Sequence, residues 1–231
     1  MICEGRRSGG VAPPWNGGTA ERGEGVSGEK VVNWEGFIKK LFKMAEPYLD
    51  RRGDLLHTRV AHEYALLLME KEGGDRRIVE PAIILHDVGW SRVDPAEIKE
   101  AFGVRAVGEK AARINRVHEL EGALIAQELL EELEYDPSLI DQIIPIVERH
   151  DSGCETKSLE ERLVKDADKL WRFSRVGFED EMERQKLTPS ERYQFLVKNL
   201  PCWFLTKTAE ELAERELEKR ALEFERDLVP E

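Results

Sequence analysis

The sequence predicts a single all-α domain, and three observations lead to this fold class. From Val31 onward, apolar residues recur at intervals of three and four, which is the period of helices buried on one side. No stretch alternates between apolar and polar residues as a half-buried strand does. The 231 residues, 41% hydrophobic and 35% charged, are enough to build one large core.

Residues 1–30 precede this domain and are expected to be a disordered leader. They are rich in glycine, contain Pro13-Pro14 and lack a periodic apolar pattern. The helical domain is therefore expected to span 31–231.

Most of the predicted helices have a recognisable start or stop signal. Glycine ends a helix because it readily adopts the left-handed conformation that follows a last turn, as expected at Gly73-Gly74 and Gly89. An aspartate followed by proline begins a helix at Asp94-Pro95 and again at Asp136-Pro137. In chain order, these helices are expected over about 34–49, 54–73, 76–88, 94–103, 116–134, 136–150 and 158–175.

Two C-terminal helices are predicted over 187–227. Capping boxes announce them, Thr188 with Glu191 and Thr208 with Glu211, because each side chain can bond to the backbone N–H of the other residue. The last helix is dense in Glu, Lys and Arg, which indicates a solvated outer helix.

Composition excludes several classes of partner. A formal charge of −12 argues against a nucleic-acid polymer as ligand. No apolar run reaches the length of a membrane span, and the first 30 residues lack the core of a signal peptide. The three cysteines are odd in number and far apart, so neither a disulfide framework nor a thiolate zinc site is expected. We expect a cytoplasmic protein with no membrane partner.

All five histidines lie between positions 57 and 150, and three of them share a face with buried apolar residues. These are His57, His86 and His150, each on a different predicted helix. Any one of them alone reads as a hydrogen-bonded core histidine. Three imidazoles that converge in a dry interior need a shared partner, which a divalent cation supplies. His62 lies about 140° round the helix from His57 and is expected to flank the site.

Carboxylates near these histidines provide the charge that a cation requires. Asp87 follows His86, and adjacent helical residues point about 100° apart, so both reach one ion only where the helix ends. Asp166 lies one turn after Leu163 and is expected to point inward. Asp168 lies about 200° further round the helix and is expected to face solvent.

The ordered segments HTRVA from His57, ILHDVG around His86-Asp87, and VKDADKL around Asp166 resemble the HD-domain superfamily of metal-dependent phosphohydrolases. The resemblance covers about 54–175 and implies an orthogonal helical bundle. It also implies that His57, His86, Asp87 and Asp166 bind a metal ion. His118 and His150 are similar to the additional ligands of two-metal members, so one or two ions are implied.

The resemblance further implies hydrolysis of a small phosphoester, a nucleotide or another organic phosphate, by metal-activated water. Asp87, His118 and His150 are then expected at the reacting atoms, although in one-metal members such histidines contact the phosphate instead. Imidazole and carboxylate ligands suit Mn, Fe, Co, Ni, Zn or Mg, and the sequence does not choose among them.

Basic residues near these motifs are candidates for phosphate binding. Arg113 and Arg116 lead towards His118, and Lys169 follows Asp166 by three positions, with Arg172 a turn later. Trp90 stands where many HD hydrolases have a lysine, so we expect it to wall the pocket instead.

Two other functions have the same sequence features. Some members with the same six ligands are mixed-valent di-iron oxygenases. A non-catalytic module is the second alternative, with a structural metal and acidic C-terminal helices that bind a partner. Homo-oligomerisation stays open.

Overall fold

The computed structural model describes residues 33–101, 108–153 and 155–224, and the predicted leader lies outside these ranges. Every regular element within them is helical, which confirms the all-α class. None of these helices combines the length and the apolar character needed to cross a membrane.

The described chain forms ten α-helices and two short 3-10 helices, η1 and η2. In order they are α1 (Trp34–Leu49), α2 (Leu55–Glu72), α3 (Arg76–Leu85), η1 (Val88–Arg92), α4 (Pro95–Ala101), α5 (Glu109–Glu132), α6 (Pro137–Val147), α7 (Leu159–Leu170), η2 (Trp171–Phe173), α8 (Arg175–Gln185), α9 (Pro189–Trp203) and α10 (Lys207–Glu223).

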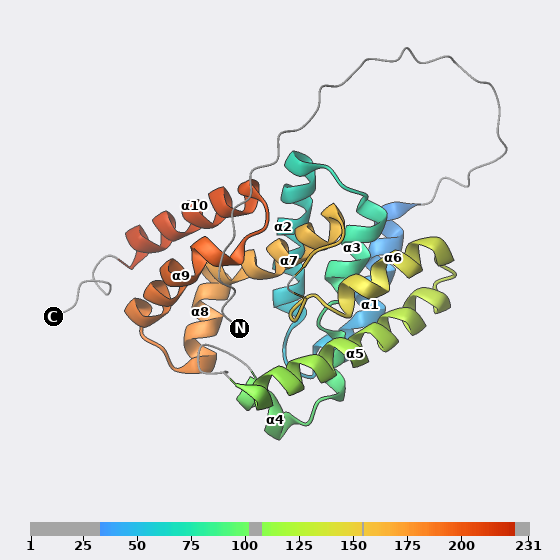
Figure 1. Ribbon diagram of the computed structural model, residues 1–231, viewed down its shortest axis with the longest axis horizontal. Coiled ribbons are helices and arrows are strands. Elements are labelled where there is room, and N and C mark those ends of the chain that lie inside the picture. The colour runs from blue at the N-terminus through green and yellow to red at the C-terminus, as the bar shows by residue number, and fades with distance from the viewer. Residues whose placement is uncertain (1–32, 102–107, 154, 225–231) are drawn as a thin grey trace, which may run out of the picture.

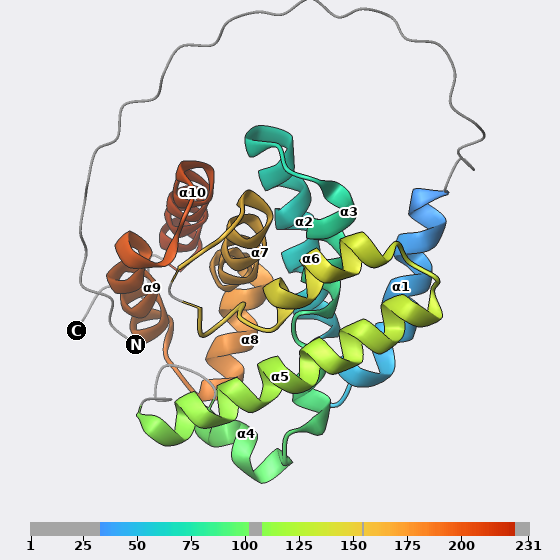
Figure 2. The ribbon, with the colours of Figure 1, turned by 45° about the vertical axis from the view of Figure 1, so that its right-hand side comes forward.

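Helices α2 and α7 pack against each other in the middle of the molecule. Helices α8, α9 and α10 lie on one side of this pair, and α1, α3, α5 and α6 lie on the other (Figures 1 and 2). The main core joins both sides through fully buried residues such as Leu68, Ile83, Leu170 and Phe178. Elements that are distant in sequence therefore meet around α2 and α7.

Several helix boundaries differ from those predicted. Helix α3 ends at Leu85, three residues early, and α5 begins at Glu109 rather than near 116. His118 consequently lies well inside a helix and is fully buried. Helix α8 was not predicted, because its charged sequence has little apolar periodicity.

The two C-terminal caps have different outcomes. The capping box of Thr188 and Glu191 is present at the start of α9. Helix α10 is instead capped by Thr206, whose hydroxyl accepts a hydrogen bond from the Ala209 N–H. Thr208 donates its hydroxyl to Glu72 on α2, so the prediction that it caps the helix was wrong.

The 3-10 helix η1 lies directly against the backbone of α5. A Cβ added at Gly89 would overlap the His118 carbonyl oxygen and the Gly122 nitrogen. Only glycine allows this approach, because any side chain would occupy the space of α5 backbone atoms. The close packing brings His86 and Asp87 next to His118.

Candidate metal centre

Six buried side chains from different parts of the fold converge between α2, α5 and α7. They are His57 on α2, His86 at the end of α3, Asp87 before η1, His118 on α5, His150 just after α6 and Asp168 on α7. Five of the six are among the expected ligands. Asp168 takes the place that was expected for Asp166.

One half of the cluster is formed by His57, His86, Asp87 and Asp168. The nearest ring nitrogens of the two histidines lie 3.3 and 3.5 Å from Asp87 Oδ2. Asp168 Oδ1 lies 3.0 Å from His57 Nε2 and 3.5 Å from His86 Nε2. The first three residues each offer one ligand atom, and those atoms lie within 4.8 Å of one another, so they could hold a metal ion.

The other half is formed by Asp87, His118 and His150, which make a second group with ligand spacing. The Nε2 atoms of the two histidines are 3.2 Å apart. Asp87 Oδ1 lies 3.5 Å from His150 Nε2 and 3.8 Å from His118 Nε2. Asp87 thus presents one oxygen to each half, the arrangement of a carboxylate that can bridge two ions.

Hydrogen bonds to the backbone fix the ring orientations of His86 and His150. The Nδ1 atoms of His86 and His150 lie 2.7 and 2.8 Å from the carbonyl oxygens of Ile83 and Val147. A carbonyl oxygen only accepts, so each Nδ1 carries a proton, and Nε2 is the ring nitrogen that faces the cluster and would bind an ion once it is unprotonated. His86 Nε2 is buried and has no hydrogen-bond partner among the described residues. A divalent ion fits this donor set, because it would satisfy that nitrogen.

The histidine pKa values reflect a balance between burial and carboxylates. Burial lowers the pKa of His57, but hydrogen bonds to Asp168 and Asp87 outweigh it and raise the value to about 9. Burial likewise lowers the pKa of His150, and its bond to Asp87 raises the value to about 9. Burial and the neighbouring His150 lower the pKa of His118 to about 3. Two imidazoles therefore carry positive charge that a cation would replace.

The two carboxylates of the cluster remain ionised despite their burial. Burial raises the pKa of Asp87, but His86 and the Arg52 guanidinium hold it well below its usual range. Burial also raises the pKa of Asp168, and hydrogen bonds to His57 and His86 outweigh this effect. Both residues are therefore anionic at neutral pH, as metal ligands must be.

Asp166 is turned away from the cluster, which corrects the expectation that it binds metal. Its carboxylate accepts hydrogen bonds from the Leu205 N–H at 2.8 Å and from the Thr206 N–H and hydroxyl at 2.8 and 2.7 Å. Both carboxylate oxygens are thus engaged at the turn between α9 and α10. Asp166 anchors this turn.

Helical phase predicted that Asp166, rather than Asp168, points towards the cluster. This prediction was wrong because α7 is buried on nearly all sides. Residues 163–168 are all buried, so a single inward stripe does not exist on this helix. Asp168 lies four residues after Val164 and three before Trp171, and both of these residues are in the core. That spacing was the available signal for Asp168.

Comparison with known proteins identifies the family of the chain. The family model for the HD domain matches residues 55–172, which is half of the chain. The chain belongs to the HD-domain family. No curated protein matches it.

Two crystal structures share the fold of this HD domain. A predicted HD superfamily hydrolase from an uncultured Thermotogales bacterium is 21% identical, with a TM-score of 0.55 over 81% of this chain and 89% of the other. An HD-superfamily hydrolase from Bacillus thuringiensis is 22% identical, with a TM-score of 0.57 over 83% of this chain and 95% of the other.

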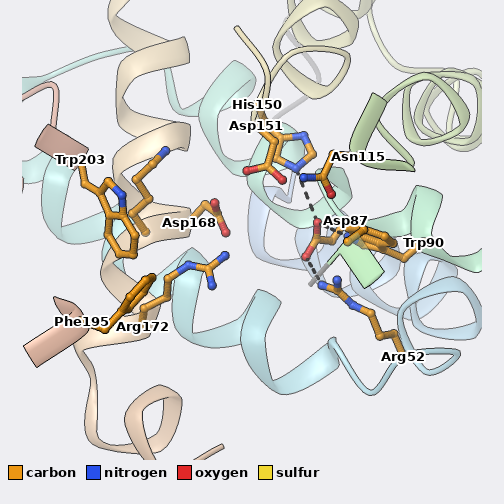
Figure 3. A pocket seen from close by; sticks show the side chains of 12 residues that line it. Arg52, Asp87, Trp90, Asn115, His150, Asp151, Asp168, Arg172, Phe195 and Trp203 are labelled. Atoms are coloured by element: carbon orange, nitrogen blue, oxygen red, sulfur yellow. Dashed lines mark hydrogen bonds and ion pairs between the residues drawn. The ribbon is translucent and has the colours of Figure 1, made fainter. Parts of the chain in front are cut away.

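Trp90 stands where many HD hydrolases have a lysine, and it lines the pocket as expected. Its indole N–H donates to Asp87 Oδ1 at 3.1 Å. Its ring stacks on His118 with centroids 4.0 Å apart, and the Arg52 guanidinium lies 4.4 Å from the Trp90 ring centroid. Arg52 also donates to Asp87 Oδ2 at 3.0 Å, so Trp90 and Arg52 together hold the Asp87 carboxylate (Figure 3).

The pocket beside the cluster has a volume of about 220 Å³. Asp87, His150 and Asp168 lie in its wall, so the cluster is accessible from it (Figure 3). Arg52, Lys169 and Arg172 supply positive charge to the same wall. Lys169 was expected there and Arg172 was an alternative, but nothing in the sequence indicated Arg52.

Arg113 and Arg116 do not line this pocket, contrary to the expectation that they contact substrate. Arg113 is exposed and lies 3.4 Å from Glu97. Arg116 pairs with Glu148 at 2.6 Å and with Glu119 at 3.3 Å. Glu119 accepts the backbone N–H groups that follow His150, so this arginine supports the loop that carries a ligand.

Proposed function

We propose that this HD domain is a metal-dependent phosphohydrolase that cleaves a small phosphoester. The observation that carries the proposal is the position of the cluster: two ligand groups share Asp87 and adjoin a pocket with three cationic side chains. The solved structures that share the fold are named hydrolases, which supports the proposal.

Each part of the site has a role in this reaction. The cluster would hold a divalent ion, which when bound would supply Lewis acidity towards a phosphate and a water molecule. Lys169, Arg172 and Arg52 bind the remaining phosphate oxygens and orient the ester. His118 and His150 either complete the second metal site or donate hydrogen bonds to the phosphate. Trp90 and Arg52 keep Asp87 in one orientation, which fixes the distance between the two halves.

Three cations share the pocket wall with three carboxylates, Asp87, Asp151 and Asp168, so a bound divalent ion would make the wall positive and favour an anionic substrate, which an oxygenase of the same fold does not require in general. Both activities use the same ligands, so the reaction itself must separate them. A catalytically silent module would show neither reaction.

The experiment begins with elemental analysis of the purified protein. The protein loaded with Mn, Co, Ni or Mg is then tested for phosphate release from a panel of nucleotides and sugar phosphates. We expect metal-dependent release at equal rates with and without oxygen, and a loss of about 100-fold or more in Asp87→Ala. Arg172→Ala should raise KM, while Arg113→Ala, a charge-matched control outside the pocket, should not. Oxygen uptake by iron-loaded protein without phosphate release would refute the proposal.

A further inference from the structure

Helix α5 exposes an apolar stripe on its outer side. Val117, Leu120 and Leu124 are 41%, 43% and 58% exposed, and they follow one another at intervals of three and four residues. Figure 2 shows α5 along the outside of the described chain. Side chains at this spacing form one ridge along a helix, so the stripe is a surface on which a second helix can pack.

The stripe on α5 differs from the exposed leucines elsewhere in the described chain. An apolar residue that is exposed singly is normal on a protein surface. On α2, Leu56 and Leu67 lie on one side of the helix, but the exposed Arg59 and Glu63 separate them. The three apolar side chains of α5 are instead neighbours, so they expose a continuous patch.

The two ends of the stripe carry opposite charge. Lys110 and Arg113 precede it on the same face of α5, and Glu128 and Glu131 follow it; all four residues are exposed. Two α5 helices that pack antiparallel would place the basic end of each opposite the acidic end of the other. A parallel pair would place like charges together, which costs free energy.

A second pocket lies at the acidic end of the stripe, where α5 leads into α6. Its volume is about 420 Å³, and Glu131, Glu134 and Asp141 lie in its wall. None of the described residues in this wall is a lysine or an arginine. The pocket therefore provides space and negative charge for a cationic side chain at the end of a helix packed along α5.

We propose that the outer face of α5 binds a second copy of this chain, with the two α5 helices antiparallel about a two-fold axis near Leu120. Val117 then packs against the partner's Leu124. The same register places Arg113 opposite the partner's Glu128 and Lys110 opposite the partner's Glu131, at the edge of the acidic pocket. Two-fold symmetry makes each of these contacts occur twice.

A second copy fits this face because its apolar and charged positions select one register. Intervals of three and four residues suit the shallow crossing of antiparallel helices. Each end of α5 carries the charge that complements the other end of the same helix, which an unrelated partner would not need. The inference does not depend on the proposed hydrolase function.

Sedimentation equilibrium of the full chain tests for the dimer. A single pair of helices is a small interface, so we expect a reversible dimer with a Kd of roughly 1–100 μM. Leu124→Glu should raise this Kd by about 100-fold or more, because two-fold symmetry buries the new charge at two contacts.

Leu222→Glu is the matched control. Leu222 is an exposed leucine on α10, which lies on the other side of the α2–α7 pair from α5 (Figure 1). The Kd of the dimer should not change in this variant. Because Leu124 and Leu222 are both exposed, neither substitution should unfold the chain, which circular dichroism checks.

Charge reversal tests the antiparallel orientation. Arg113→Glu places a carboxylate opposite the partner's Glu128, and Glu128→Arg places a guanidinium opposite the partner's Arg113. Each single variant should raise the Kd by roughly 5-fold to 30-fold, because two attractive pairs become repulsive. The double variant restores opposite charges in both pairs and should return the Kd close to the wild-type value.

Three results would overturn the proposal. The first is a wild-type chain that remains monomeric at the highest of these concentrations. The second is a dimer whose Kd is unchanged by Leu124→Glu, because such a dimer forms through another face. The third is a double charge variant that binds no more tightly than the single variants, which would exclude the antiparallel register.

Discussion

The two oxygens of Asp87 face different histidines, and this single carboxylate connects the two halves of the proposed centre. Oδ2 faces His57 and His86, while Oδ1 faces His118 and His150. Arg52 donates a hydrogen bond to Oδ2 and Trp90 donates one to Oδ1. The Asp87 carboxylate therefore cannot rotate without the loss of a buried hydrogen bond. Whether one or two ions bind therefore depends on how Arg52 and Trp90 hold the Asp87 side chain.

Asp166 and Asp168 provide a matched pair at this scale, since both are buried on α7. We expect Asp168→Asn to lose bound metal, because the amide removes an anionic ligand. Asp166→Asn should retain metal but lower the free energy of unfolding by about 1–3 kcal/mol, because one backbone or hydroxyl donor loses its acceptor. Elemental analysis and denaturant unfolding measure the two effects. Loss of metal in Asp166→Asn would contradict the assignment.

His118→Ala separates one bound ion from two. If two ions bind, the variant should contain half the metal of the wild type, because the second group loses one of three ligands. If one ion binds, metal content should barely change. His62→Ala is the control, since His62 bonds to Glu80 at 2.9 Å outside the cluster and its loss should leave metal content unchanged.

At the scale of elements, the contact between η1 and α5 positions the second half of the centre. Gly89 lies against the α5 backbone where His118 and Gly122 are found. Helix α3 ends just before this point; His86 still has helical backbone angles, Asp87 departs from them, and both side chains face the cluster. The ligands depend on this backbone contact as much as on their own side chains.

Gly89→Ala should separate η1 from α5, because the added methyl group overlaps backbone atoms that cannot move alone. We expect destabilisation of about 1–3 kcal/mol and reduced metal content, measured by denaturant unfolding and elemental analysis. Gly122→Ala is the control at the same contact, since its Cβ would meet the nearest atom at an ordinary 3.4 Å. Equal effects of the two substitutions would show that the overlap at Gly89 is not the cause.

At the scale of the whole molecule, the six clustered residues come from positions 57 to 168, two from the central α2–α7 pair and four from the side of this pair that holds α3, α5 and α6. An ion bound there would add a link between α2, α5, α7 and the segments that follow α3 and α6. The unfolded chain cannot hold these groups together, so metal binding should stabilise the folded state.

Removal of metal by a chelator should lower the unfolding temperature. At a free metal concentration 100 times Kd, binding contributes about 2.7 kcal/mol, which corresponds to roughly 5–10 °C for a chain of this length. The apo protein should remain helical, because its main core excludes the metal site. Differential scanning calorimetry and circular dichroism check both points. An Asp87→Ala variant should show no response to the chelator.

The sequence alone determined the all-α class, most helix positions and five of the six clustered residues, because hydrophobic period and the ordered His and Asp motifs are local properties. Only the tertiary structure placed Asp168 rather than Asp166 in the cluster, and Arg52 and Arg172 rather than Arg113 or Arg116 in the pocket wall. Helical phase gives a side chain's direction relative to its own helix. On α7, which is surrounded by other elements, phase does not identify which neighbour each residue meets, and packing between distant segments supplies that information.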